Sequence, residues 1–108
     1  VSSVYSSDAL AGLIVNLVEG FKNNAGAEDI TVVLNSEDLK KIEDTVLSGL
    51  KAKMLSGVIL KANDNFDGGF RIAVNDGGAY YDYSKDAVTD MLSNYLSPKI
   101  AALMKEAE

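Results

Sequence analysis

The sequence contains no cysteine, no histidine and no tryptophan. Without cysteine and histidine, the chain cannot form disulfide bonds, Cys/His zinc sites, cysteine nucleophiles or Ser-His-Asp triads. These absences exclude several large classes of enzyme and metalloprotein. Because the chain needs no oxidising compartment, we expect a cytoplasmic protein by default.

Positive charge is also scarce: the chain has 10 Lys and Arg against 16 Asp and Glu, which gives a net charge of -6. An acidic protein repels phosphate backbones and anionic lipids, so we expect neither nucleic acid nor a membrane surface as a partner. The most apolar stretch, residues 9–18, is interrupted by Asn16 and is shorter than the roughly 20 residues that span a bilayer. We therefore expect no direct membrane insertion.

The 108 residues are 47% hydrophobic and 24% charged, which is typical of a globular chain with one core. The first residues are rich in serine and do not begin with Met. We interpret residues 1–7 as a disordered segment or an expression scar, and residues 8–108 as a single globular domain of a longer protein.

The first expected element is an amphipathic helix over residues 8–22, with Ser7 as its N-cap. Its apolar stripe has coiled-coil spacing, but about two heptads are too few to sustain a coiled coil alone. We therefore predict that this helix joins the domain to its assembly and exposes apolar surface near residues 4–13. The residues predicted to bind a partner chain are Leu10, Leu13 and Leu17.

A β-α-β unit is expected next. The β-branched run 30–34 predicts an interior strand, and Asn35 or Ser36 is expected to cap a second helix that ends near Ser56. The helix's apolar stripe is Leu39, Ile42, Val46, Leu50 and Met54. A second strand over residues 58–62 should run parallel to the first, because such a crossover normally joins parallel strands.

Asp76-Gly77 between two alternating runs, 70–75 and 78–83, is a strong hairpin signal. The pairs that follow from a two-residue turn are Asn75–Gly78, Ile72–Tyr81, Phe70–Tyr83 and Arg71–Asp82. The residues expected to face the helices are Phe70, Ile72, Val74, Ala79, Tyr81 and Tyr83. A slip of one residue would move this apolar set to the opposite face.

Ser84 is expected to cap a last helix that Pro98 kinks or restarts. The helix's apolar positions are Val88, Met91, Leu92, Tyr95, Leu96, Ile100, Leu103 and Met104. The sequence thus predicts an α+β fold in which a small mixed four-stranded sheet packs against helices, in the order α-β-α-β-β-β-α.

Two local patterns superficially match catalytic or metal sites. The spacing Ser48-Gly-Leu-Lys51 matches penicillin-recognising enzymes, but their companion motifs are missing. Residues 63–68 echo the start of a calcium-binding loop, but Val74 stands where a bidentate Glu is required. We interpret the first as a helix surface and the second as a polar turn.

The remaining candidates are weaker still. The glycine pairs at 68–69 and 77–78 lack the Lys and Ser or Thr of a phosphate-binding loop, and Tyr80 is interpreted as ordinary surface. An enzyme that uses Asp64 with Asp67 is a distant alternative. We therefore expect no catalytic, cofactor-binding or metal-binding residues, and no enzyme.

The C-terminal part carries three motifs that resemble a known family: Gly68-Gly69-Phe70, Asp76-Gly77, and residues 96–103 with the sequence Leu-Ser-Pro-Lys-Ile-Ala-Ala-Leu. The sequence resembles the C-terminal head domain of the E subunit of V-type (A/V-type) ATPases, the peripheral-stalk or stator subunit. Members of that family often have an Arg-Leu pair early in the last helix, where residues 86–90 read Asp-Ala-Val-Thr-Asp. Contacts of that arginine are therefore not carried over.

The resemblance implies a non-catalytic stator domain of a rotary ATPase that transports protons or sodium ions in ATP synthesis or hydrolysis. It implies two partners, a second peripheral-stalk subunit and a nucleotide-binding subunit of the catalytic headpiece, and no cofactor. It also implies a cytoplasmic protein that is held at the membrane through the complex. The alternative is a small-molecule-binding or regulatory α+β domain, which would have a polar pocket between sheet and helices.

Overall fold

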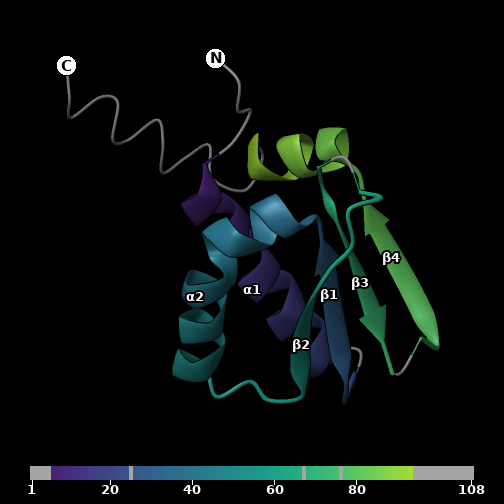
Figure 1. Cartoon of the computed structure of the whole chain (residues 1–108). Helices are drawn as coiled ribbons and strands as arrows, with labels where there is room; N and C mark the ends of the chain where they lie inside the picture. The colour runs from purple at the N-terminus through teal and green to yellow at the C-terminus, as the bar shows by residue number, and fades with distance from the viewer. Residues whose placement is uncertain (1–5, 25, 67, 76, 94–108) are drawn as a thin grey trace.

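The computed structural model describes residues 6–24, 26–66, 68–75 and 77–93. The elements are α1 (Ser7–Asn24), β1 (Ile30–Leu34), α2 (Ser36–Ala52), β2 (Val58–Ala62), β3 (Phe70–Val74) and β4 (Ala79–Tyr83). Residues 85–93 are also helical. Both α1 and α2 lie on one side of the sheet, and residues 85–93 lie across one end of it (Figure 1). The predicted α+β fold and its order of elements are confirmed.

The sheet has the strand order β2-β1-β3-β4. Strand β1 is interior, as its apolar residues on both faces predicted, and it runs parallel to β2 and antiparallel to β3. The predicted hairpin register is also confirmed. The observed pairs between β3 and β4 include Phe70–Tyr83, Arg71–Asp82 and Ile72–Tyr81.

Both strands of the hairpin end one residue before the predicted turn, although the N–H of Gly78 donates to the carbonyl of Asn75 at 3.2 Å, as a two-residue turn requires. Asn75 leaves the strand with a φ of 51°, and β4 begins only at Ala79. The backbone N–H of Asn75 donates to the carbonyl of Asp29 at 2.8 Å, and its side-chain oxygen accepts from the N–H of Glu28 at 3.1 Å. These bonds tie the hairpin to the start of β1, and they account for the left-handed conformation that Asn tolerates better than most residues. Asp76 lies outside the described residues.

The core fills the space between the sheet and the helices. The fully buried large side chains are Ile14, Val18, Ile30, Val32, Leu34, Ile42, Val46, Phe70, Ile72 and Val88. No polar or charged side chain is buried within the described part of the chain. Where α2 crosses α1, a methyl group at Gly49 would lie 3.0 Å from Val15, so the two helices approach closely there. The fold is therefore stabilised mainly by apolar burial.

The first helix begins one residue earlier than predicted. The hydroxyl of Ser6, not Ser7, accepts from the N–H of Ala9 at 3.1 Å, and Ser7 is already helical. The N-cap of α2 is Asn35, whose side chain accepts from the N–H of Asp38 at 2.7 Å. Adjacent serines offer equivalent caps, so the pattern alone does not choose between them.

The end of α2 differs from the prediction. The helix ends at Ala52, and Met54, expected in the buried stripe, is 89% exposed with a φ of 57°. The N–H of Leu55 donates to the carbonyl of Leu50 at 2.9 Å, and the N–H of Met54 donates to that of Lys51 at 3.0 Å. These two bonds form a Schellman motif with Met54 at the left-handed position, so its side chain turns out to solvent.

Candidate functional site

The three predicted partner-binding residues do not form an exposed stripe. Leu10 and Leu13 are only 2% and 4% exposed and belong to the core, whereas Leu17 is half-buried at the margin of the core. The expected exposure of Leu10 and Leu13 is therefore wrong, because both side chains pack inside the domain. That the three residues contact a partner stays a prediction. Of the three, Leu17 alone has an accessible side chain. Of the range 4–13, residues 4 and 5 lie outside the described residues.

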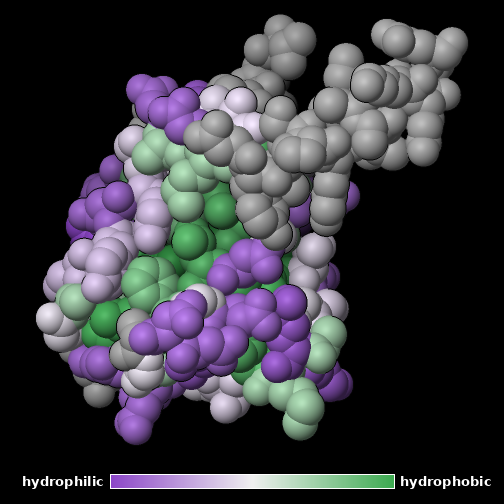
Figure 2. All heavy atoms as spheres, turned by 180° about the vertical axis from the view of Figure 1, so that it is seen from behind, coloured by the Kyte–Doolittle hydropathy of each residue, from purple (hydrophilic) through white to green (hydrophobic). Residues whose placement is uncertain are grey.

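An apolar band nevertheless follows α1. Figure 1 shows α1 behind α2, and from behind the molecule presents a band of hydrophobic atoms bordered by hydrophilic residues (Figure 2). Half-buried Leu17 and Phe21 of α1 pack against the core on this helix. The ring of Phe21 lies 4.7 Å from that of Tyr81 on β4, which remains 42% exposed because β4 is an edge strand. Helix α1 and β4 thus share an apolar margin that the domain does not fully bury.

The face of the sheet that points away from the helices carries a different set of side chains, which we call the outer face. It has two rows that run across the strands from β2 to β4. The first row is Lys61, Val33, Arg71 and Asp82, and the second is Ile59, Thr31, Ala73 and Tyr80. Ile59 and Tyr80 are each 60% exposed. Large side chains therefore remain accessible on a face that no described helix covers (Figure 1).

The arginine on the outer face is held by three neighbours. Nε of Arg71 donates to Asp82 at 2.5 Å, and this bond raises the pKa of the guanidinium. The rings of Phe66 and Tyr80 lie 5.4 Å and 5.2 Å from its central carbon, which places the cation against two aromatic faces. The sequence pattern indicated ordinary surface at Tyr80. Counting the hairpin register outward places Tyr80 on the face of Arg71 and Asp82, which is the signal that could have found this cluster.

A depression of about 300 Å³ lies over the two rows. Apolar groups of Thr31, Val33 and Ala73 line it. Its polar side chains include Lys61, Asn63, Arg71 and Tyr80. Lys61 makes no ion pair within the described residues. Sequence patterns could not place Lys61 beside Val33, because the parallel register of β1 and β2 depends on where the crossover returns.

The candidate catalytic residues that the structure describes are exposed on the surface. Asp64, the candidate partner of Asp67, accepts from the N–H and the hydroxyl of Ser36 at 2.9 and 2.7 Å, and these bonds hold the pKa of its carboxyl below its usual value. Asp64 thus acts as a second cap on α2, while Asp67 lies outside the described residues. Ser48 and Lys51 are both exposed on α2. In the described ranges, no cluster of three or more acidic, His or Cys residues could hold a metal ion.

Comparisons with known proteins bear on the role of these surfaces. The chain is 43% identical over 103 residues to the V-type ATP synthase E subunit of Treponema denticola, which covers 95% of the chain and 50% of that relative. It is 30% identical to the V-type ATP synthase E subunit of Treponema pallidum, over 95% of the chain and 44% of the relative. Over almost its whole length, the chain is therefore similar to V-type ATPase E subunits.

The V-type proton ATPase E subunit of Borrelia duttonii is 29% identical over 97% of the chain and 52% of its own length. The chain therefore spans about half the length of the curated relatives it matches. A scan against models of protein families finds no match. The E subunit is a component of a membrane-associated ATPase, and within the described residues of this chain no helix is long and apolar enough to cross a bilayer.

Proposed function

We propose that this chain is the C-terminal head domain of a peripheral-stalk subunit and that it has no catalytic role. It holds the catalytic headpiece of a rotary ATPase against the torque of the rotor, on the cytoplasmic side of the membrane. The observation that carries this proposal is the similarity to V-type ATPase E subunits over almost the whole chain. The transported ion is a proton or sodium ion.

The core supports a structural role over a small-molecule-binding one. A ligand site inside the fold would need polar groups that converge on a cavity between sheet and helices. All buried side chains of the described part are apolar instead. The accessible features are surfaces, which suits a protein that binds other proteins.

The margin between α1 and β4 supports contact with a second stalk subunit. Leu17 and Phe21 pack against the core with part of their surface accessible, and Tyr81 extends the same margin from β4. Leu17 is also one of the three residues predicted to bind a partner. A helix of the second stalk subunit that lies along this margin would remove the remaining apolar surface from water.

The test is association of the full-length E subunit, carrying Leu17→Glu in this domain, with the second stalk subunit of the same organism. We expect binding at least about tenfold weaker, because a carboxylate at an apolar interface loses its hydration without gaining a partner. Leu47→Glu is the matched control, since Leu47 is 46% exposed on α2. Thermal unfolding of both variants separates lost binding from lost folding.

Equal binding by wild type, Leu17→Glu and Leu47→Glu would refute the α1 margin as the stalk interface. A second measurement concerns catalysis. Isothermal calorimetry with ATP should detect no saturable binding, because the sequence has no phosphate-binding loop. Micromolar ATP binding would refute the non-catalytic role.

A further inference from the structure

The outer face of the sheet concentrates exposed side chains of the types that dominate protein interfaces. Tyr80 and Arg71 belong to the residue types most enriched among residues that carry binding energy, and Ile59 adds an aliphatic group at the β2 end. Val33 and Ala73 are half-buried between them and form the floor of the depression. The face therefore combines an apolar floor with a polar margin, as many interfaces do.

The charges on this face oppose those of the whole protein. Lys61 and Arg71 are the two residues paired with Val33 across the neighbouring strands. Because adjacent strands lie about 4.8 Å apart, the two cationic residues are separated by roughly 10 Å in the backbone. Asp82 is the only carboxylate in the two rows, so the rows carry one more positive than negative charge, whereas the chain carries -6.

The arginine is also positioned before any partner arrives. The pair with Asp82 uses Nε and Nη2, so the guanidinium keeps further N–H donors for an external acceptor. Two aromatic rings and the carboxylate restrict its rotamers, which lowers the conformational entropy that binding would remove. Lys61, at the other side of Val33, contributes a charge that no described residue neutralises in an ion pair.

We propose that the outer face of the sheet docks an acidic protein surface, and that a carboxylate side chain of the partner lies over Val33 between Lys61 and Arg71. Apolar neighbours of that carboxylate then contact Ile59 and Tyr80. The partner is a protein surface with an Asp or Glu set among apolar residues. This proposal rests on the proposed function, in which the catalytic headpiece supplies that surface.

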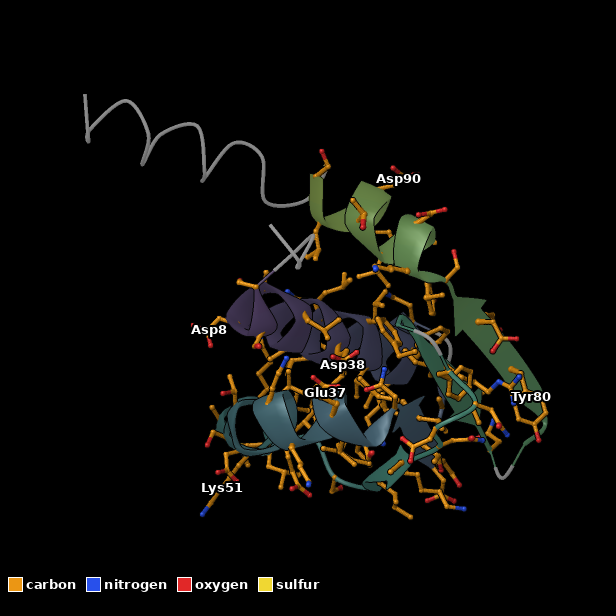
Figure 3. The ribbon with its side chains drawn as sticks, turned by 45° about the horizontal axis from the view of Figure 1, so that its top comes forward. Asp8, Glu37, Asp38, Lys51, Tyr80 and Asp90 are labelled. Atoms are coloured by element: carbon orange, nitrogen blue, oxygen red, sulfur yellow. The ribbon has the colours of Figure 1, made fainter. Side chains whose placement is uncertain are left out.

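The experiment measures binding of the assembled peripheral stalk, with the full-length E subunit, to the immobilised headpiece of the same organism at low and high salt. Lys61→Glu should weaken binding at least about tenfold at physiological salt, and the loss should shrink at high salt, where charges are screened. The matched control is Lys51→Glu, an equal charge change on exposed α2. Figure 3 shows Lys51 and Tyr80 at opposite sides of the molecule. The control should bind within about twofold of wild type.

Tyr80→Ala provides a second variant without a charge change. It should weaken binding at least about fivefold at both salt concentrations, because it removes an exposed aromatic contact and one ring that positions Arg71. Circular dichroism spectra that match wild type exclude loss of the fold. Lys61 and Tyr80 are both exposed, so neither substitution opens a core cavity.

Each outcome distinguishes the two proposals. If the wild-type stalk does not bind the headpiece, the proposed function is wrong and this docking assignment falls with it. If the wild-type stalk binds, but Lys61→Glu and Tyr80→Ala bind as tightly as Lys51→Glu, only the outer-face proposal is overturned. Self-association of the stalk that Lys61→Glu abolishes, with headpiece binding unchanged, would also overturn it in favour of a second copy as the occupant.

Discussion

The two faces of strand β3 carry different chemistry although they alternate along five residues. On the inner face, Phe70, Ile72 and Val74 are buried against the helices. On the outer face, Arg71 and Ala73 are half-buried. The period of two along a strand separates the residues that stabilise the fold from those that remain free to bind, so substitutions on one face need not disturb the other.

The largest expected effect is on the inner face. Ile72→Ala should lower the free energy of unfolding by about 2–5 kcal/mol, because Ile72 is fully buried and the substitution leaves a cavity. Val33→Ala on the outer face should cost less than about 1 kcal/mol. Urea denaturation followed by circular dichroism measures both, since the chain has no tryptophan. A similar loss in the free energy of unfolding for the two variants would contradict the difference between the two faces.

Two helical glycines show the same difference between an open position and a packed one. A methyl group at Gly12 of α1 meets no atom within 4 Å, whereas at Gly49 of α2 it would lie 3.0 Å from Val15. Gly12→Ala should raise the free energy of unfolding by about 0.8 kcal/mol through helix propensity. Gly49→Ala should raise the free energy of unfolding by less, because the side chain of Val15 must shift. A larger gain at Gly49 than at Gly12 in the same denaturation assay would contradict the close approach of the helices.

Met54→Gly should stabilise the protein by about 0.5 kcal/mol. The left-handed conformation strains a residue with a Cβ by roughly 1–2 kcal/mol, and the greater freedom of glycine in the unfolded chain offsets part of that gain. The substitution also removes an exposed apolar side chain without opening the core. Met54→Ala, which keeps the strain, is the control and should leave the thermal midpoint nearly unchanged. A lower midpoint for Met54→Gly would indicate that Met54 contacts something that stabilises it.

The smallest effect concerns pH. The N–H and hydroxyl of Ser36 hold the pKa of Asp64 below its usual value, so ionised Asp64 is favoured in the folded state. Its contribution is present above the pKa of the unfolded chain, near about 3.9, and is lost as pH falls through the lower folded value. In Asp64→Asn the amide oxygen still accepts from Ser36. The stability difference between the two proteins should therefore be constant from pH 5 to 7 and shrink below pH 4; a difference that is unchanged at pH 3 would contradict this linkage.

The sequence predicted the inner face better than the outer one. Periodicity identifies positions such as Ile42, Val46 and Ile72, because burial on one side is what produces the pattern. The pattern did not foresee that Leu10 and Leu13 would be covered, since a stripe does not tell whether its own domain or a partner covers it. Asp-Gly set the hairpin register, although both strands end one residue before the predicted turn.

The outer face was missed for a related reason. Lys61 and Val33 become neighbours only through the register of the parallel strands, which depends on the whole crossover and not on local residues. The contact of Phe66 with Arg71 likewise depends on the path of a loop. Arg71 and Asp82 could be paired from the hairpin alone, because a short turn fixes the register of its two strands.

The position of β1 between β2 and β3 also determines how fast its amide hydrogens exchange with solvent. Hydrogen bonds on both edges protect the amide hydrogens of β1, whereas β2 and β4 each have one edge without a partner strand in the described sheet. Local fraying can release the outer strands, but exchange of the central amides requires a far larger opening. The rate of deuterium uptake at the amide of Val32 therefore reports global unfolding. Faster uptake in β2 or β4 would report local opening of that edge strand.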